Sequence, residues 1–293
     1  MGLAPQVPDP LGVTLRRVLV TLRDGYRINV EEVGEGFALL VLHGGPGMDH
    51  TMFRPYLDPL GEDFRVLYVD ERGQGRSDRV DPKTLSLDVF ARDVDLLAEA
   101  LELDHFAVFG HSFGAIVATY HATELGTAVA YVISGGADTS EAMMADVEAA
   151  LGAMGPEGEA IAASWEKEKT VETEQQLQEL LRAQMPFHFH GSVPPGYGDE
   201  TIGTPDVLRY FANVGYGDFD YRPKLAGVSK PTLLLVGEHD RTTTPRAARV
   251  LHDGISNSEL VVVSDAGHMS FVEQPNAYVE AVRRFLLGVA IMA

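Results

Sequence analysis

Short apolar runs alternate along the chain with longer stretches in which apolar residues recur at helical spacing. The runs predict strands at residues 37–42, 65–69, 106–109, 129–133, 232–236 and 260–263, preceded by an antiparallel pair at residues 15–22 and 27–33. Residues 86–101 place apolar side chains such as Phe90 and Val94 on one helix face. Strands that alternate with helices predict an α/β fold with a mostly parallel, eight-stranded sheet flanked by helices.

The pattern changes between residues 136 and 223. Helical patterns are predicted there for residues 141–154, 157–181 and 205–214, with a Pro/Gly-rich stretch at residues 193–203. An insertion of this length is expected to have its own structure rather than to form a loop. We therefore predict a core domain made of residues 1–135 and 224–293, with an inserted, mainly helical cap at residues 136–223.

A serine between glycines lies where the strand at residues 106–109 leads into a predicted helix. Residues 110–114 read GHSFG and fit the pattern G-x-S-x-G, the sharp strand-to-helix turn that exposes a nucleophilic serine. Gly110 and Gly114 would remove the β-carbons that clash as strand and helix converge. Ser112 is therefore the candidate nucleophile, and the alternative is an ordinary glycine-rich loop.

Two further residues follow Ser112 along the chain in the order acid, then His, which is the order found in proteins with this type of turn. Asp240 comes after the strand at residues 232–236, and His268 comes after the last strand. A serine hydroxyl needs an imidazole to take its proton and a carboxylate to orient that imidazole. Asp240 and His268 are the candidates for these roles, with Glu238 as the alternative acid.

A glycine-rich loop, HGGPG at residues 43–47, follows the first inner strand. Such a loop can direct a backbone N–H at the substrate oxygen, and the amide of Phe113 would supply the second donor of an oxyanion hole. His43 is expected to support this loop rather than to take part in catalysis.

The HGGPG loop, the sequence DERGQGRS at residues 70–77 and the GHSFG turn together resemble the proline iminopeptidase branch of the α/β-hydrolase superfamily. The resemblance covers about residues 15–135 and 222–288. It implies that the nucleophile, acid, base and two oxyanion donors are Ser112, Asp240, His268, Gly45 and Phe113. It also implies that the protein releases N-terminal proline, or a similar residue, from small peptides. Asp70 and Arg72 are expected to be buried polar residues that support the loop beneath the site.

The chain departs from that family in the sequence of the strand-to-helix turn at residues 110–114, called the nucleophile elbow, and in the charge of two residues expected near the substrate. The family elbow is typically GGSWG, whereas GHSFG is common in esterases and lactonases of the same superfamily. Arg241 and Arg209 stand where the family has acids that hold the substrate's α-ammonium. If both face the pocket they would repel an ammonium and favour esters or lactones; the alternative is that they point to solvent or pair with cap carboxylates.

Aromatic and histidine side chains at residues 187–190 suggest a pocket wall in the cap. Phe187, His188 and His190 are candidate substrate contacts. No metal site is expected from the two histidines, because no third or fourth ligand is evident in the sequence. Trp165 is expected to pack the cap helices rather than to contact substrate.

Composition limits the remaining possibilities. The 293-residue chain has a net charge of −20, which disfavours nucleic acid, and no cysteine, which suits the cytoplasm. No apolar run is long enough to span a membrane, and the proline-containing residues 1–11 predict a loose tail. We expect a small-molecule or short-peptide substrate and no cofactor; the oligomeric state stays open. A ligand-binding protein of the same fold without catalytic activity is the remote alternative.

Overall fold

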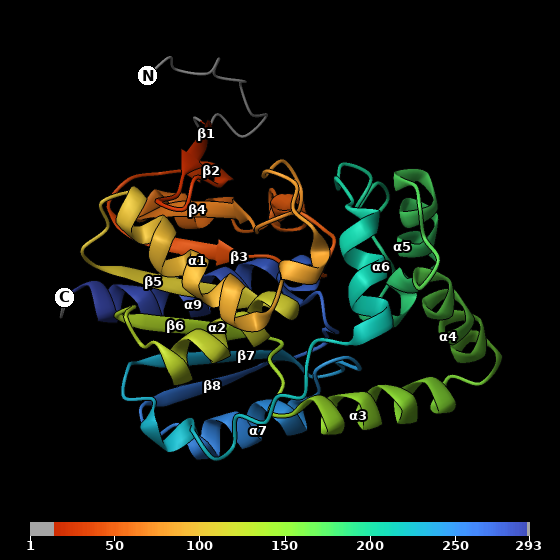
Figure 1. Ribbon diagram of the computed structural model, residues 1–293. Helices are drawn as coiled ribbons and strands as arrows, with labels where there is room; N and C mark the ends of the chain where they lie inside the picture. Colours follow the sequence, from red (N-terminus) through yellow and green to blue (C-terminus); the bar gives the residue numbers. More distant parts are fainter. Residues whose placement is uncertain (1–14, 292–293) are drawn as a thin grey trace.

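The computed structural model describes residues 15–291, so the tail predicted for residues 1–11 lies outside the described part. The strands, in chain order, are β1 (Arg16–Thr21), β2 (Arg27–Val33), β3 (Phe37–Leu42), β4 (Phe64–Asp70), β5 (Phe106–His111), β6 (Ala130–Ser134), β7 (Thr232–Gly237) and β8 (Ser258–Val263). They form one sheet in the spatial order β1-β2-β4-β3-β5-β6-β7-β8 (Figure 1). β2 is antiparallel to β1 and β4, and the neighbours from β4 to β8 are parallel. The predicted eight-stranded, mostly parallel sheet is confirmed.

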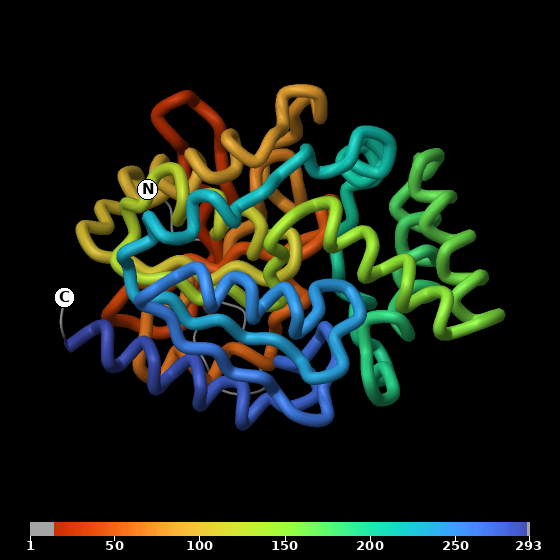
Figure 2. The backbone as a smooth tube through the Cα atoms, turned by 90° about the horizontal axis from the view of Figure 1, so that it is seen from below, coloured from red at the N-terminus to blue at the C-terminus, as the bar shows by residue number. Residues whose placement is uncertain are grey.

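Both faces of the sheet are covered, and successive residues of each inner strand serve opposite cores. In β5, Val108 packs into the core on one face and Phe109 into the core on the other; in β3, Leu40 and Val41 divide in the same way. Figure 2 shows α1 and α2 on one side of the sheet and α9 on the other. Burial on both faces explains why these strands are apolar at nearly every position.

The helices that pack on the sheet are α1 (Leu87–Ala100), α2 (Phe113–Glu124), α7 (Pro245–Gly254), α8 (Ser270–Glu273) and α9 (Pro275–Ala290). Short 3-10 helices are η1 (His50–Phe53), η2 (Asp58–Glu62), η3 (Pro82–Thr84) and η4 (Leu225–Gly227). The helix predicted for residues 86–101 is α1. Ser86 caps it by accepting a hydrogen bond from the amide of Val89 at 3.3 Å, and the apolar face with Phe90 is buried.

Four helices follow β6 and lie beside one end of the sheet, at the right of Figure 1. They are α3 (Ser140–Ala153), α4 (Pro156–Glu168), α5 (Glu174–His188) and α6 (Pro205–Val214). The prediction of a single helix at residues 157–181 was wrong: the chain forms α4 and α5 there, because Thr173 and Gln176 form a capping box that begins a new helix. Leu177, Leu181 and Leu208 form a small core of their own between these helices. The division into a core domain and a cap stays a prediction.

Candidate active site

Ser112 lies at the turn between β5 and α2 in a backbone conformation that L-residues rarely adopt, with φ 55° and ψ −116°. The neighbouring glycines are sterically required. A β-carbon on Gly110 would lie 2.1 Å from the carbonyl oxygen of Gly114, and one on Gly114 would lie 2.4 Å from that of Leu42. The strand therefore passes into the helix closely enough to hold Ser112 at the carboxyl edge of the sheet.

The imidazole of His268 is joined to the carboxylate of Asp240 by a hydrogen bond of 2.8 Å from Nδ1 to Oδ2. Asp240 also accepts hydrogen bonds from the backbone amides of Thr242 and Thr243, at 2.8 and 3.0 Å. Burial alone would raise the pKa of Asp240, but His268 and these amides outweigh it and hold the pKa below its usual value. Asp240 is therefore a buried carboxylate that fixes the orientation of the imidazole.

Glu238, the alternative acid, takes no part in this arrangement. Its side chain is exposed and accepts a hydrogen bond from the amide of Asp265 at 3.4 Å. Ser112 and His268 line the same cavity, whereas no hydrogen bond between them is present among residues 15–291. Bonds of this kind commonly tighten only when substrate is bound.

The glycine-rich loop places its amides beside Ser112. Gly45 and Phe113 both line the cavity, and no hydrogen bond of the described residues uses either of their amides. His43 supports the loop from below: its Nδ1 donates to the carbonyl of Gly44 at 2.7 Å, and its Nε2 accepts from the amide of Glu71 at 3.2 Å. This pattern requires a neutral imidazole, and burial accordingly lowers the pKa of His43.

Asp70 and Arg72 are buried, as predicted. Asp70 accepts from Nδ1 of His50 at 2.5 Å and from the amide of Arg76 at 2.8 Å, and Arg72 pairs with Asp93 at 2.6 Å. Burial alone would lower the pKa of His50, but its two carboxylate neighbours, Asp70 and Glu31, raise it to about 9. This network holds the loop at residues 70–77 beneath the site.

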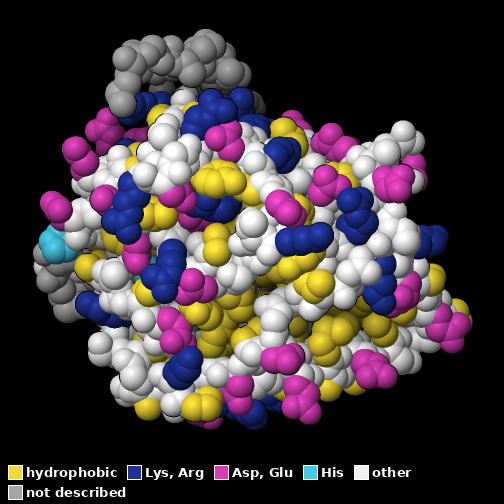
Figure 3. Space-filling view, in the orientation of Figure 1, with side chains coloured by type: hydrophobic (Ala, Val, Ile, Leu, Met, Phe, Trp, Pro, Cys, Tyr) yellow, Lys and Arg dark blue, Asp and Glu magenta, His cyan; other side chains and the backbone are white. Residues whose placement is uncertain are grey.

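The cavity above Ser112 has a volume of about 630 Å³ and is mostly apolar. Six methionines line it: Met48, Met52, Met143, Met144, Met185 and Met269. Figure 3 shows hydrophobic side chains gathered in a hollow between the sheet and the helices beside it. Methionine side chains are flexible and polarizable, so such a wall can adapt to apolar groups of different shapes.

His188 lines the cavity, as predicted, and lies next to His268. Its Nδ1 is 3.0 Å from the hydroxyl of Thr242, and its ring centroid is 5.4 Å from that of His268. Burial and the neighbouring His268 lower the pKa of His188 to about 3. On the other side, the buried ring of His111 lies 4.7 Å from His268, and burial holds its pKa well below the usual value. His268 is thus packed between two neutral imidazoles.

The other predicted cap contacts lie outside the cavity. Phe187 is fully buried and packs against Trp165, with ring centroids 5.0 Å apart, because it faces α4. His190 follows the end of α5, is exposed and stacks on His239. Trp165 was expected only to pack the cap helices, but it also lines the cavity. Sequence order alone could not show which side of these segments faces the substrate.

Neither predicted arginine lines the cavity. Arg209 pairs with Asp206 at 2.5 Å, and Arg241 donates to the carbonyls of Pro186 and Phe189 at 3.3 and 3.4 Å. Partners in α5, in the residue after it and in α6 therefore hold both guanidinium groups away from the site. Repulsion of a substrate ammonium was predicted only if both arginines faced the pocket, and that condition is not met. For Arg209 the structure shows the alternative, a pair with a carboxylate.

Glu168 is a cavity residue that the sequence analysis missed. It lines the apolar wall near the end of α4 and accepts a hydrogen bond from the side-chain amide of Gln184 at 2.8 Å. Burial raises the pKa of the Glu168 carboxyl to about 7. Nothing in the sequence distinguishes it from the exposed Glu166 and Glu157 in the same charged helix.

Comparison with known proteins agrees with the α/β-hydrolase fold that the sheet and the turn at Ser112 indicate. The family model described as "Alpha/beta hydrolase family" matches residues 39–281. The chain belongs to this family. The hydrolase is 25% identical to a proline iminopeptidase of Saccharolobus solfataricus, with 89% of this chain and 94% of the relative covered. It is 24% identical to a pimeloyl-[acyl-carrier protein] methyl ester esterase of Legionella pneumophila, with 88% and 99% covered.

Among solved structures, the hydrolase is similar to a proline iminopeptidase-related protein of Thermus thermophilus. The TM-score is 0.74 at 29% identity, with 95% of this chain and 99% of that chain covered. The resemblance to the proline iminopeptidase branch is thereby confirmed, and the chain is an enzyme of the hydrolase class. None of the helices within residues 15–291 is both long and apolar enough to cross a membrane.

Proposed function

We propose that this enzyme is a serine hydrolase that works through an acyl-enzyme. The observation that carries the proposal is the hydrogen bond between His268 and the buried Asp240, because His268 and Ser112 line the same cavity. In the first step Ser112 Oγ bonds to the substrate carbonyl carbon while His268 Nε2 takes the hydroxyl proton. The free amides of Gly45 and Phe113 stabilise the oxyanion, an effect worth about 3–4 kcal/mol per donor in enzymes where it has been tested.

The second half of the cycle uses the same groups. His268 returns the proton to the leaving group as the bond between the carbonyl carbon and that group breaks. Water then attacks the ester of Ser112 with His268 as the base, which releases the carboxylic acid and restores the hydroxyl. Asp240 stays ionised throughout and keeps Nδ1 of His268 protonated, so that Nε2 is the basic nitrogen.

The cavity favours esters with bulky apolar groups as substrates. Its methionine-lined wall and volume of about 630 Å³ suit an extended acyl or alcohol group better than a single proline ring. Burial of such a group is favourable at roughly 25 cal/mol per Å² of apolar surface. Short aliphatic esters and lactones would leave much of this wall unfilled.

A second candidate is release of N-terminal proline from peptides, which is the activity named for several relatives. Glu168 is the observation in its favour, because a carboxylate in an apolar wall can bind an α-ammonium once Arg209 and Arg241 are held elsewhere. An ammonium beside Glu168 would also favour the ionised carboxylate.

A fluorophosphonate probe tests the proposed chemistry. We expect one covalent adduct, located on Ser112 by peptide mass spectrometry and blocked by prior incubation with an ester substrate. Ser140, which lines the same cavity, is the internal comparison and should stay unmodified. An enzyme that hydrolyses esters and yet shows no adduct on Ser112 would contradict the proposal.

The substrate class is decided by kcat/KM for three compounds: a prolyl arylamide, its N-acetylated form and an aryl ester with a long acyl chain. We expect the ester to be the best substrate, with kcat/KM rising with acyl length. A strong preference for the free amine that is lost in Glu168→Gln would instead establish the aminopeptidase.

A further inference from the structure

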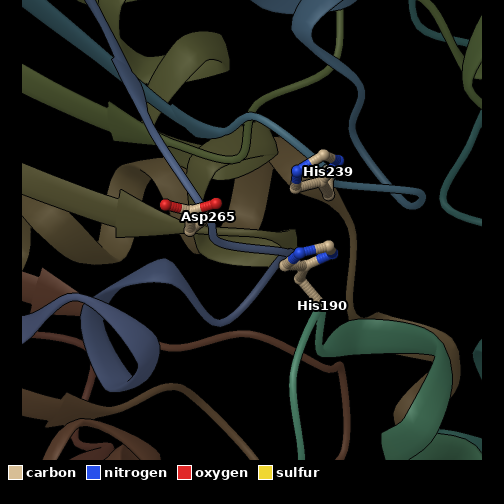
Figure 4. A group of neighbouring side chains, drawn as sticks. All are labelled: His190, His239 and Asp265. Atoms are coloured by element: carbon tan, nitrogen blue, oxygen red, sulfur yellow. The ribbon is translucent and has the colours of Figure 1, made fainter.

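Three exposed side chains from distant parts of the chain converge next to the loops that carry the catalytic residues (Figure 4). His190 follows α5, His239 follows β7 and Asp265 follows β8. One ligand atom from each residue lies within 4.8 Å of the ligand atoms of the other two. We propose that His190, His239 and Asp265 bind a divalent transition-metal ion, with Zn²⁺ as the best match.

The donor set determines which metals suit the site. Two imidazoles and one carboxylate are a ligand set that proteins use for zinc when water occupies the fourth position. Imidazole nitrogen suits Zn²⁺, Cu²⁺ and Ni²⁺, whereas Mg²⁺ and Ca²⁺ prefer oxygen ligands alone. The site therefore excludes the common alkaline-earth ions and selects for borderline metals.

All three ligand groups are available. No hydrogen bond or ion pair among the described residues uses the ring nitrogens of His190 or His239, or the carboxylate oxygens of Asp265. The two rings stack with their centroids 3.8 Å apart and their planes at 17°. Both are exposed, so they can tilt about their side-chain bonds until a lone pair of each points at a shared ion.

The backbone beneath these side chains is held in place by hydrogen bonds. Glu273 accepts from the amide of His190 at 3.0 Å and from the amide of Gly267 at 2.6 Å, so a single carboxylate joins the segment after α5 to the loop after β8. The amide of His239 donates to the carbonyl of Ala266 at 2.8 Å. Metal binding thus needs side-chain rotation only, which lowers its entropic cost.

The location gives the site a consequence for the enzyme. His239 directly precedes Asp240, and Asp265 lies three residues before His268. A bound ion would join the end of α5 to both of the loops that carry these residues. The net charge of −20 raises the local concentration of cations. The ion takes no part in acyl transfer, so metal-free enzyme is expected to turn over ester, and the ion would stabilise the arrangement.

Calorimetric titration of the full-length, chelator-treated protein with Zn²⁺ tests the proposal. We expect one ion per chain in the wild type and affinity lower by about tenfold or more in His239→Gln and in Asp265→Asn. Asparagine suits the second variant because Asp265 has a φ of 52°, a conformation that Asn also adopts readily. His105→Gln is the matched control, since His105 is exposed at the opposite end of the sheet.

Thermal unfolding gives an independent readout. Zn²⁺ at a concentration near the Kd of the wild type should raise the Tm of the wild type and of His105→Gln, but should raise that of His239→Gln much less, because an ion that binds only the folded state stabilises it in proportion to its occupancy. The proposal is overturned if the wild type binds no Zn²⁺ under these conditions. Equal affinity in the wild type and both site variants would also overturn it, since that result would place the ion elsewhere.

Discussion

Glu168 is an ionisable side chain of the cavity whose titration should make the stability of the protein depend on pH. Burial raises its pKa from 4.5 to about 7, so the folded protein holds this proton more tightly than the unfolded chain does. The resulting contribution to stability is present in full below about pH 4.5 and is lost as the pH rises through 7. One pKa unit corresponds to 1.36 kcal/mol, so the loss amounts to roughly 3 kcal/mol at most.

The variant Glu168→Gln removes this titration while keeping a polar side chain beside Gln184. Relative to the wild type, the variant should gain stability between about pH 5 and pH 8. Urea unfolding at both pH values measures the difference, and Glu166→Gln, which changes an exposed carboxylate of the same helix, is the control. A difference between Glu168→Gln and the wild type that does not change with pH would show that the half-buried position of Glu168 does not raise the pKa of its carboxyl.

At the scale of elements, the junction of β5 and α2 is the place where one β-carbon matters most. Gly110→Ala would put that atom 2.1 Å from a backbone oxygen, and the backbone cannot move aside without displacing Ser112. We expect a loss of about 1–3 kcal/mol in the free energy of unfolding, together with loss of activity.

The control for this prediction is Gly152→Ala in α3, where the new β-carbon meets no atom within 4 Å. Alanine is the better helix former, so this variant should be neutral or more stable by up to about 1 kcal/mol. Chemical denaturation of both variants measures the contrast. Similar free energies of unfolding for the two alanine variants would contradict the claim that a β-carbon at residue 110 cannot be accommodated between β5 and α2.

The inner strands were predictable because burial on both faces leaves an uninterrupted apolar run; β3 matches its predicted bounds to the residue. The break before α5 was missed, although Thr173 and Gln176 show the capping-box spacing in the sequence. The motifs also indicated Ser112, Asp240 and His268, because each follows a strand at the same sheet edge.

The contacts of residues 136–223, the predicted cap, were not predictable in the same way. His188 faces the cavity and its neighbour Phe187 does not, since adjacent helical residues point in different directions and no motif fixes the rotation of α5. The partners of Arg241 lie some fifty residues away along the chain, so sequence order could not reveal that pairing. His190, His239 and Asp265 belong to three segments that are distant along the chain, so sequence order could not reveal that they lie together either.

At the scale of the whole molecule, the net charge of −20 should oppose folding through self-repulsion. Salt screens this repulsion, with a Debye length of about 10 Å at 0.1 M and about 3 Å at 1 M. We therefore expect Tm to rise between low and high NaCl concentration, as followed by calorimetry at pH 8 in the presence of a chelator. A Tm that falls over this range would mean that the attractive surface ion pairs outweigh the net repulsion.

Turnover of an aryl ester by Ser112→Ala is the most direct test of the central claim, that the turn between β5 and α2 presents the nucleophile. The account predicts a kcat lower than that of the wild type by roughly 10³–10⁶-fold, with an unchanged circular dichroism spectrum. The matched variant Ser140→Ala, which alters a serine of the same cavity, should keep kcat within about twofold of the wild type. Near wild-type turnover in Ser112→Ala would contradict the account.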